Sequence, residues 1–170
     1  MPRAGVEPKP TWSTVPGAVR RTAEEMLGAR VRRALRAWGG YGPTPTFRLR
    51  LDDGSRAFLK AVHEESGEFA LAAHRREERL YHELGDVIAA WSPAFRGSFA
   101  VDGWRVILLE DLGPKSAPPW TPSLTRKVAH ALADFHGATL GTPLPDWLPR
   151  PQALADMSRW TWGWAEDPAD

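Results

Sequence analysis

Two strands joined by a tight turn are predicted by residues 47–62 of this 170-residue chain, which read FRLRLDDGSRAFLKAV. Leucines and arginines alternate from Phe47 to Leu51, which is the period of a strand with one buried face. Asp and Gly tolerate positive φ angles, so residues 52–55, DDGS, favour a hairpin turn. Residues 57–62 would then form the partner strand.

Helical and strand patterns continue on both sides of this hairpin. Helices with one apolar face are expected at residues 16–28, 66–85 and 122–137, and a short helix at 152–159. Three more strands are expected at residues 31–38, 95–101 and 104–109. The order of these elements predicts an α+β fold in which one helix is inserted into a five-stranded antiparallel sheet.

The composition excludes several kinds of protein. The chain has no cysteine, which rules out disulfides, zinc–thiolate sites and cysteine nucleophiles. A net charge of +1 argues against sequence-independent nucleic-acid binding. No apolar run approaches the ~18–20 residues of a membrane helix, and no signal peptide is visible. We therefore expect a cytoplasmic chain that binds neither nucleic acid nor membrane.

Lys60 is a charged residue on an apolar strand. Strand alternation puts it on the same face as Phe58 and Val62, where a lysine is costly unless its charge is paired. Alternatively, the strand lies at the edge of the sheet and the lysine extends its amine to water.

Glu77 is the natural partner for Lys60, because it falls within the apolar stripe of the helix that follows. Its neighbour Glu78 would be rotated by about 100° toward solvent. Alternatively, Glu77 only borders the stripe and pairs with Arg76 or Arg79. The five histidines show no metal-ligand spacing, so solvated or capping roles are expected for them.

Two segments could contact a ligand through their backbone. Glycine lets amide groups approach phosphate oxygens closely, although such a stretch can also be a plain hairpin turn. The glycines in question are Gly39, Gly40 and Gly42. A buried strand runs directly into a connector that starts at Glu110 and is first acidic and then rich in proline. This order suggests a hinge between two lobes. The exposed backbone of the hinge could pair with a planar base.

Taken in chain order, these features resemble the first half of the aminoglycoside phosphotransferase/choline kinase-like family, which has a protein-kinase-like fold. The resemblance rests on the glycine loop, the strand lysine, the helix glutamate, the sequence LEDL at 109–112 and the sequence ALADFHG at 131–137. It implies a flexible segment at 1–14, a kinase-like N-lobe with its hinge at 15–112, and the beginning of an incomplete helical C-lobe at 113–170.

The same resemblance implies ATP and Mg²⁺ as cofactors and assigns roles to individual residues. Lys60 would bind the α- and β-phosphates of ATP, and Glu77 would orient the lysine. The backbone at Glu110 and Leu112 would pair with adenine. Gly39, Gly40 and Gly42 would form the loop over the phosphates.

The chain departs from the family after His136 and Gly137. The family's catalytic loop reads His-Gly-Asp with an Asn five residues later, and a later Asp binds Mg²⁺. Here Ala138 follows the glycine, and the chain contains no Asn. We therefore predict no catalytic residue and no metal ligand within the 170 residues. The C-terminal tryptophans would pack against the remaining part of the C-lobe or form a platform for sugar stacking; they are Trp147, Trp160, Trp162 and Trp164.

The expected function is therefore the ATP-binding portion of a phosphotransferase that moves the γ-phosphoryl group of ATP to a hydroxyl of a small molecule. The acceptor is not identified by the sequence. One alternative is a non-catalytic half-lobe that binds nucleotide or a protein partner. Another is an unrelated α+β interaction domain.

Overall fold

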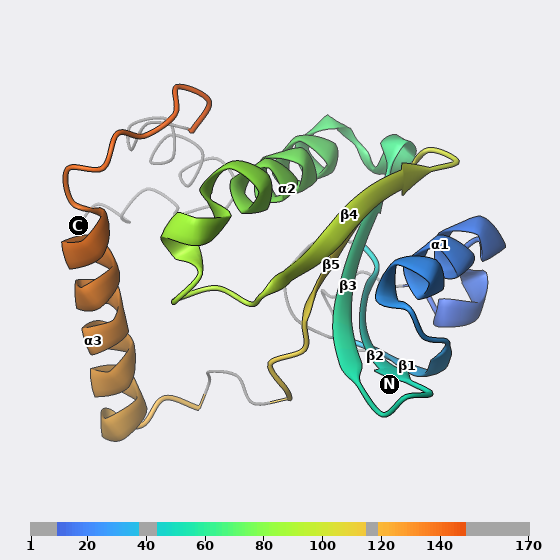
Figure 1. The fold of residues 1–170 in the computed structure, drawn as a ribbon, viewed down its shortest axis with the longest axis horizontal. Helices are drawn as coiled ribbons and strands as arrows, with labels where there is room; N and C mark the ends of the chain where they lie inside the picture. The colour runs from blue at the N-terminus through green and yellow to red at the C-terminus, as the bar shows by residue number, and fades with distance from the viewer. Residues whose placement is uncertain (1–9, 38–43, 115–118, 149–170) are drawn as a thin grey trace, which may run out of the picture. The chain divides into compact units, whose positions relative to one another are not determined.

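The computed structural model describes residues 10–37, 44–114 and 119–148 (Figure 1). The chain divides into two units, residues 1–135 and 136–170, and the sheet lies entirely in the first. The elements are, in chain order, the 3-10 helix η1 (Trp12–Thr14), α1 (Gly17–Leu27), β1 (Val31–Arg36), β2 (Thr46–Leu51), β3 (Arg56–His63), the 3-10 helix η2 (Glu64–Ser66), α2 (Glu68–Ile88), β4 (Phe95–Val101), β5 (Trp104–Glu110) and α3 (Pro122–Thr139).

The five strands form one antiparallel sheet in the order β1-β2-β3-β5-β4, with α2 inserted in the chain between β3 and β4. This confirms the predicted α+β fold and the inserted helix. The predicted hairpin also forms, since Gly54 adopts a φ of 86° and Asp53 Oδ1 accepts a 2.8 Å hydrogen bond from the Ser55 amide. The predicted boundary at residues 112–113 stays a prediction.

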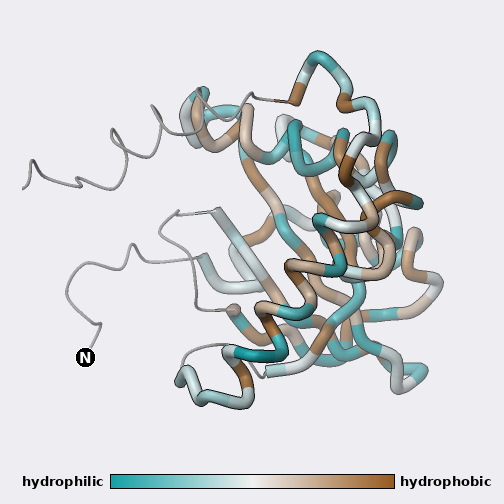
Figure 2. Tube along the Cα trace, turned by 90° about the vertical axis from the view of Figure 1, so that its left-hand side faces the viewer, coloured by the Kyte–Doolittle hydropathy of each residue, from teal (hydrophilic) through white to brown (hydrophobic). Residues whose placement is uncertain are grey.

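One face of the sheet carries the larger apolar core, beneath α1. Figure 2 colours the chain by hydropathy, and along β2 and most of β3 every second residue is buried in this core. The helix contributes Val19 and Ala23, both fully buried. The sheet contributes Phe47, Leu49, Leu51, Ala57, Leu59, Ala61, Val106 and Leu108. Burial of these side chains fixes the register of the strands.

The opposite face of the sheet holds a smaller apolar cluster, to which α2 is anchored. Tyr81 of α2 packs with the buried Ile107 and Leu109 of β5. Its ring also stacks on Phe95 of β4 at a centroid distance of 5.2 Å and an interplanar angle of 9°. These contacts fix the position of the helix over the middle of the sheet, where Lys60 also lies.

Two helices extend beyond the glycines predicted to end them. Helix α2 continues through Gly85 to Ile88, and α3 continues through Gly137 to Thr139. A glycine stops a helix when it adopts a left-handed conformation. Gly28 does so after α1, with a φ of 71°, and this predicted stop is confirmed. The N-terminus of α3 is also as predicted, because Thr121 Oγ1 accepts a hydrogen bond from the Leu124 amide.

The end of the segment predicted to be flexible, residues 1–14, is ordered by packing. Trp12 and its neighbours form η1, and the Trp12 ring meets Phe47 edge-on at 5.2 Å. The sequence did not predict this contact for two reasons. The prolines of the segment suggested a flexible chain, and a lone tryptophan carries no periodic signal. Trp38 and the short helix expected at 152–159 lie outside the described residues. Within the described ranges, no helix combines the length and the apolar character needed to cross a membrane.

Candidate functional site

Lys60 lies on a central strand, since β3 is flanked by β2 and β5. The alternative of an edge-strand lysine is therefore wrong. Its cross-strand neighbours are Thr46 on β2 and Ile107 on β5. The buried face of β3 carries Leu59 and Ala61, so Lys60 projects from the face covered by α2.

Glu77 of α2 meets this lysine. The distance from Lys60 Nζ to Glu77 Oε1 is 2.6 Å, and the side chains are 36% and 30% exposed. The predicted ion pair is therefore confirmed, and Arg79, considered as an alternative partner, pairs with Glu83 one helical turn further on. Both side chains are partly exposed to solvent, so a ligand could reach the ammonium group.

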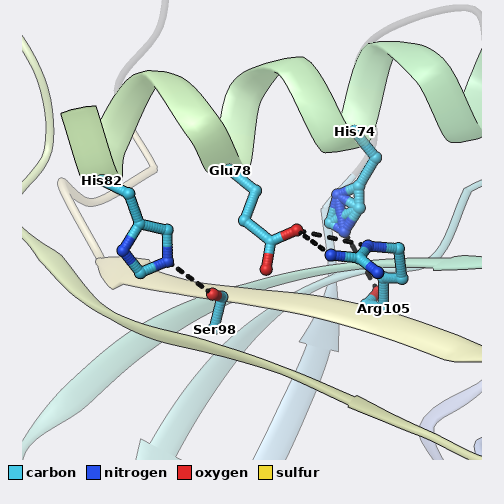
Figure 3. A network of polar contacts seen from close by, with 5 residues as sticks. All are labelled: His74, Glu78, His82, Ser98 and Arg105. Carbon is cyan, nitrogen blue, oxygen red and sulfur yellow. Dashed lines mark hydrogen bonds and ion pairs between the residues drawn. The ribbon is translucent and has the colours of Figure 1, made fainter. Parts of the chain in front are cut away.

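A second polar contact holds the same helix to the sheet, and sequence reasoning missed it (Figure 3). The Arg105 guanidinium of β5 donates two hydrogen bonds to Glu78 Oε2, of 2.5 and 3.2 Å. The Glu78 side chain is only 14% exposed, so its predicted orientation toward solvent is wrong. The reason is that the apolar stripe alone does not define the buried face, because β5 also presents a long cationic side chain to the helix.

Histidines complete this contact (Figure 3). His74 is 7% exposed and its Nε2 lies 3.1 Å from the Arg105 carbonyl oxygen, which corrects the expected solvated role. Further along α2, His82 Nε2 lies 3.0 Å from Ser98 Oγ of β4. His63 has the expected capping role, since its Nδ1 accepts a hydrogen bond from the Glu65 amide at the start of η2.

The electrostatics of this contact favour a charged glutamate and a neutral histidine. Burial alone would raise the pKa of Glu78, but hydrogen bonds from Arg105 and Ser98 lower it below its ordinary value. Burial lowers the pKa of His74, because the imidazolium loses its hydration, and the attraction of Glu77 and Glu78 only partly opposes this effect.

The chain after β5 is fixed by an ion pair that the sequence analysis also missed. Arg48 of β2 donates to both carboxylate oxygens of Asp111, at 2.8 and 3.0 Å. The Asp111 side chain is 5% exposed and also accepts a hydrogen bond from the Gly113 amide. Burial would raise the pKa of Asp111, but the bonds from Arg48 and Gly113 lower it. Arg48 is the cross-strand partner of Phe58 and so lies on the Lys60 face of the sheet, but its alternation with buried residues does not point to Asp111.

The predicted hinge residues lie on either side of Asp111. Glu110 ends β5, where its amide donates a 2.8 Å hydrogen bond to the Ala94 carbonyl and its carboxylate accepts one from the Ala94 amide. Leu112 is 68% exposed, and its backbone forms no hydrogen bond with another described residue. Leu112 therefore has backbone groups open to a ligand, whereas the Glu110 amide is already occupied.

The loop glycines Gly39, Gly40 and Gly42 lie outside the described residues. The residues on either side of this loop are described, and they lie at the ends of β1 and β2 that are close to Lys60. Ala37 and Thr46 exchange backbone and side-chain hydrogen bonds of 2.9 and 3.0 Å, and Thr46 is the cross-strand neighbour of Lys60. The loop therefore starts and ends at the Lys60 end of β2.

The described residues fit the two expected cofactors differently. The partly exposed Lys60 ammonium group suits a phosphate of ATP. No group of three or more histidine, aspartate or glutamate side chains in the described ranges could hold a metal ion such as Mg²⁺. Magnesium ligands are therefore not assigned to any described residue.

Neither the models of known protein families nor the curated protein sequences give a match.

Proposed function

We propose that this chain is the nucleotide-binding part of an ATP-dependent phosphotransferase with a protein-kinase-like fold. The reaction would move the γ-phosphoryl group of ATP to a hydroxyl of a small molecule, as the resemblance to the aminoglycoside phosphotransferase/choline kinase-like family implies. The observation that supports this proposal best is the 2.6 Å ion pair between Lys60 of a central strand and Glu77 of the inserted helix.

The chemistry of the pair suits phosphate binding. A lysine ammonium group has three N–H donors, and Glu77 Oε1 takes one of them. Because the Lys60 side chain is 36% exposed, the remaining donors can reach phosphate oxygens from the open side. Glu77 would hold the ammonium group in one position and so reduce the entropy lost when a phosphate binds.

The hinge lies at a suitable distance from this pair. Lys60 is opposite Ile107 on β5, and Glu110 ends the same strand three residues later. Three residues of strand span about 10 Å, which a nucleoside triphosphate can bridge. The base would then lie near the open backbone of Leu112, and the phosphates near Lys60 and the loop between β1 and β2.

Binding of ATP is the direct test, measured by isothermal titration calorimetry with wild-type protein and three variants. Lys60→Ala should weaken ATP binding by about tenfold or more, because a hydrogen bond to a charged group is lost. Glu77→Gln should weaken it less, because the lysine stays but is no longer fixed. Glu83→Gln is the matched control on the same helix, and its affinity should equal that of the wild type. Equal ATP affinity in all four proteins would contradict the proposal.

Phosphoryl transfer needs a separate test, since no catalytic residue is predicted within the 170 residues. The coding DNA should be read past this codon. A continuation with His-Gly-Asp and an Asn five residues later would support transfer, and Lys60→Ala should then abolish it. Transfer that survives Lys60→Ala would contradict the role proposed for Lys60. A stop codon in place of the continuation would leave a chain that binds nucleotide without catalysing.

A further inference from the structure

Three arginines form a row across three neighbouring strands. Arg33 of β1 is the register partner of Arg50 of β2, and Arg50 is in turn the partner of Arg56 of β3. Residues directly opposite one another project from the same face of a sheet. Neighbouring strands lie about 4.8 Å apart, so the row spans about 10 Å. All three side chains belong to exposed residues.

No carboxylate in the described part of the chain forms an ion pair with this row. Like charges directly opposite one another destabilise a sheet. Asp111 pairs with Arg48, and it attracts Arg56 without forming an ion pair with it. In the adjoining turn, Asp52 Oδ1 accepts a hydrogen bond from the Arg30 amide and Asp53 Oδ1 one from the Ser55 amide. Among the described residues, none forms an ion pair with the row.

The arginines also line a hollow at this end of the sheet. Its volume is about 800 Å³, which is the size of sites that take small organic ligands. Its walls are Arg32, Arg33, Arg50, Leu51, Gly54 and Arg56. Guanidinium groups bind phosphoryl oxygens through paired hydrogen bonds, which a lysine cannot reproduce. The hollow therefore combines ligand size with repeated phosphate-binding groups.

We propose that the arginine row of Arg33, Arg50 and Arg56 binds a soluble small molecule that carries two or three linked phosphoryl groups. The row has two gaps between neighbouring guanidinium groups, and a phosphoryl group in each gap would relieve the repulsion there. A nucleic acid fits less well, because the row is about 10 Å long and the whole chain carries a net charge of only +1. The site is separate from Lys60, which lies four residues beyond Arg56 on β3, about 13 Å along the strand.

The test uses inorganic tripolyphosphate as the probe, at constant ionic strength. Arg50→Gln should have two opposite effects: the thermal midpoint without ligand rises, because the central positive charge is gone, and tripolyphosphate affinity falls by about tenfold or more. Arg56→Gln should act in the same direction. Arg75→Gln, an exposed arginine on α2, is the control and should match the wild type. Unchanged tripolyphosphate affinity in both Arg50→Gln and Arg56→Gln would overturn the proposal.

Two further measurements separate this site from the proposed nucleotide site and from a macromolecular partner. Lys60→Ala should retain tripolyphosphate binding, whereas its loss would mean that there is one site around Lys60 and would overturn the separate row. A single-stranded RNA oligonucleotide should bind more weakly than tripolyphosphate at the same salt concentration. Tighter binding of the RNA would show that the row serves a nucleic acid and would also overturn the proposal.

Discussion

Individual charged residues on the α2 side of the sheet differ in how far they are withdrawn from water. The Asp111 carboxylate is 5% exposed and accepts three hydrogen bonds, from Arg48 and the Gly113 amide, which is the environment of a structural group. Lys60 is 36% exposed and has one carboxylate partner. A partly exposed lysine with unused N–H donors is available to a ligand, whereas a buried carboxylate that already accepts three hydrogen bonds is not.

Stability measurements should therefore show whether Lys60 has a ligand-binding role or a structural one. An ion pair this exposed contributes about 0–1 kcal/mol, so Lys60→Met should change the free energy of unfolding by less than about 1 kcal/mol. Urea denaturation followed by circular dichroism measures this change. The same variant should lose most of its ATP affinity. A stability loss of about 3 kcal/mol or more without a loss of ATP affinity would make Lys60 a structural residue.

His74 should make stability depend on pH. Burial lowers its pKa in the folded state below the ordinary value of 6.5, with Arg105 and Lys60 acting in the same direction and Glu77 and Glu78 opposing. Below about pH 6.5 the unfolded chain therefore binds a proton more readily than the folded one, and stability falls as the pH decreases. Above that pH the contribution of the neutral histidine is fully present.

Urea denaturation at about pH 7.5 and about pH 5.5 tests this expectation. His74→Gln can keep a hydrogen bond to the Arg105 carbonyl but cannot take up a proton, so it should lose less stability on acidification than the wild type. His130→Gln, on an exposed position of α3, serves as the control. An equal loss in wild type and His74→Gln would show that another group carries the pH dependence.

At the scale of elements, helix α2 contains a glycine that its geometry does not need. Gly85 lies inside the helix without a positive φ, and nothing lies within 4 Å of the position that a Cβ would occupy. Gly85→Ala should therefore stabilise the protein by about 0.5–1 kcal/mol, because glycine loses more backbone entropy in a helix. The thermal midpoint and urea denaturation measure the gain.

Gly97 of β4 provides the contrasting variant. It lies at a register shift of the β4–β5 pairing, has a φ of 136°, and a Cβ there would come within 2.6 Å of Met26 Sδ. Gly97→Ala should destabilise the protein in the same assay, through strain at this φ and crowding against α1. Stabilisation by Gly97→Ala, or destabilisation by Gly85→Ala, would contradict these assignments.

At the scale of the whole molecule, every buried residue of the described ranges belongs to the first unit. Both apolar clusters lie between Val15 and Leu109, and α3 has no buried residue. We therefore expect a chain of residues 1–135 to fold by itself, with a thermal midpoint within a few degrees of the complete chain. A shortened chain without a cooperative unfolding transition would contradict this expectation.

The sequence predicted the sheet well because its signals are local. Alternation from Phe47 to Leu51 and the glycine turn at Gly54 determine the hairpin without help from the rest of the fold. The ion pair between Lys60 and Glu77 could be predicted from the sequence because each residue interrupts an apolar pattern. By contrast, the Arg48–Asp111 pair joins residues 63 positions apart, and neither interrupts a pattern in a way that points to the other. The roles of Gly39, Gly40 and Gly42 stay predictions.

The position of α2 also has a consequence for the order of folding. The β2–β3 and β4–β5 hairpins need only short turns, whereas β3 and β5 pair across the long segment that separates His63 from Trp104. Closing such a segment costs entropy before its contacts repay it, so this step should come late. Before this step, α2 has only Phe58 of β3 to contact in its apolar cluster, because Ile107 and Leu109 belong to β5 and Phe95 belongs to β4. A nascent chain that has emerged only as far as Ile88 should therefore hold the lysine and the glutamate without the site that they form.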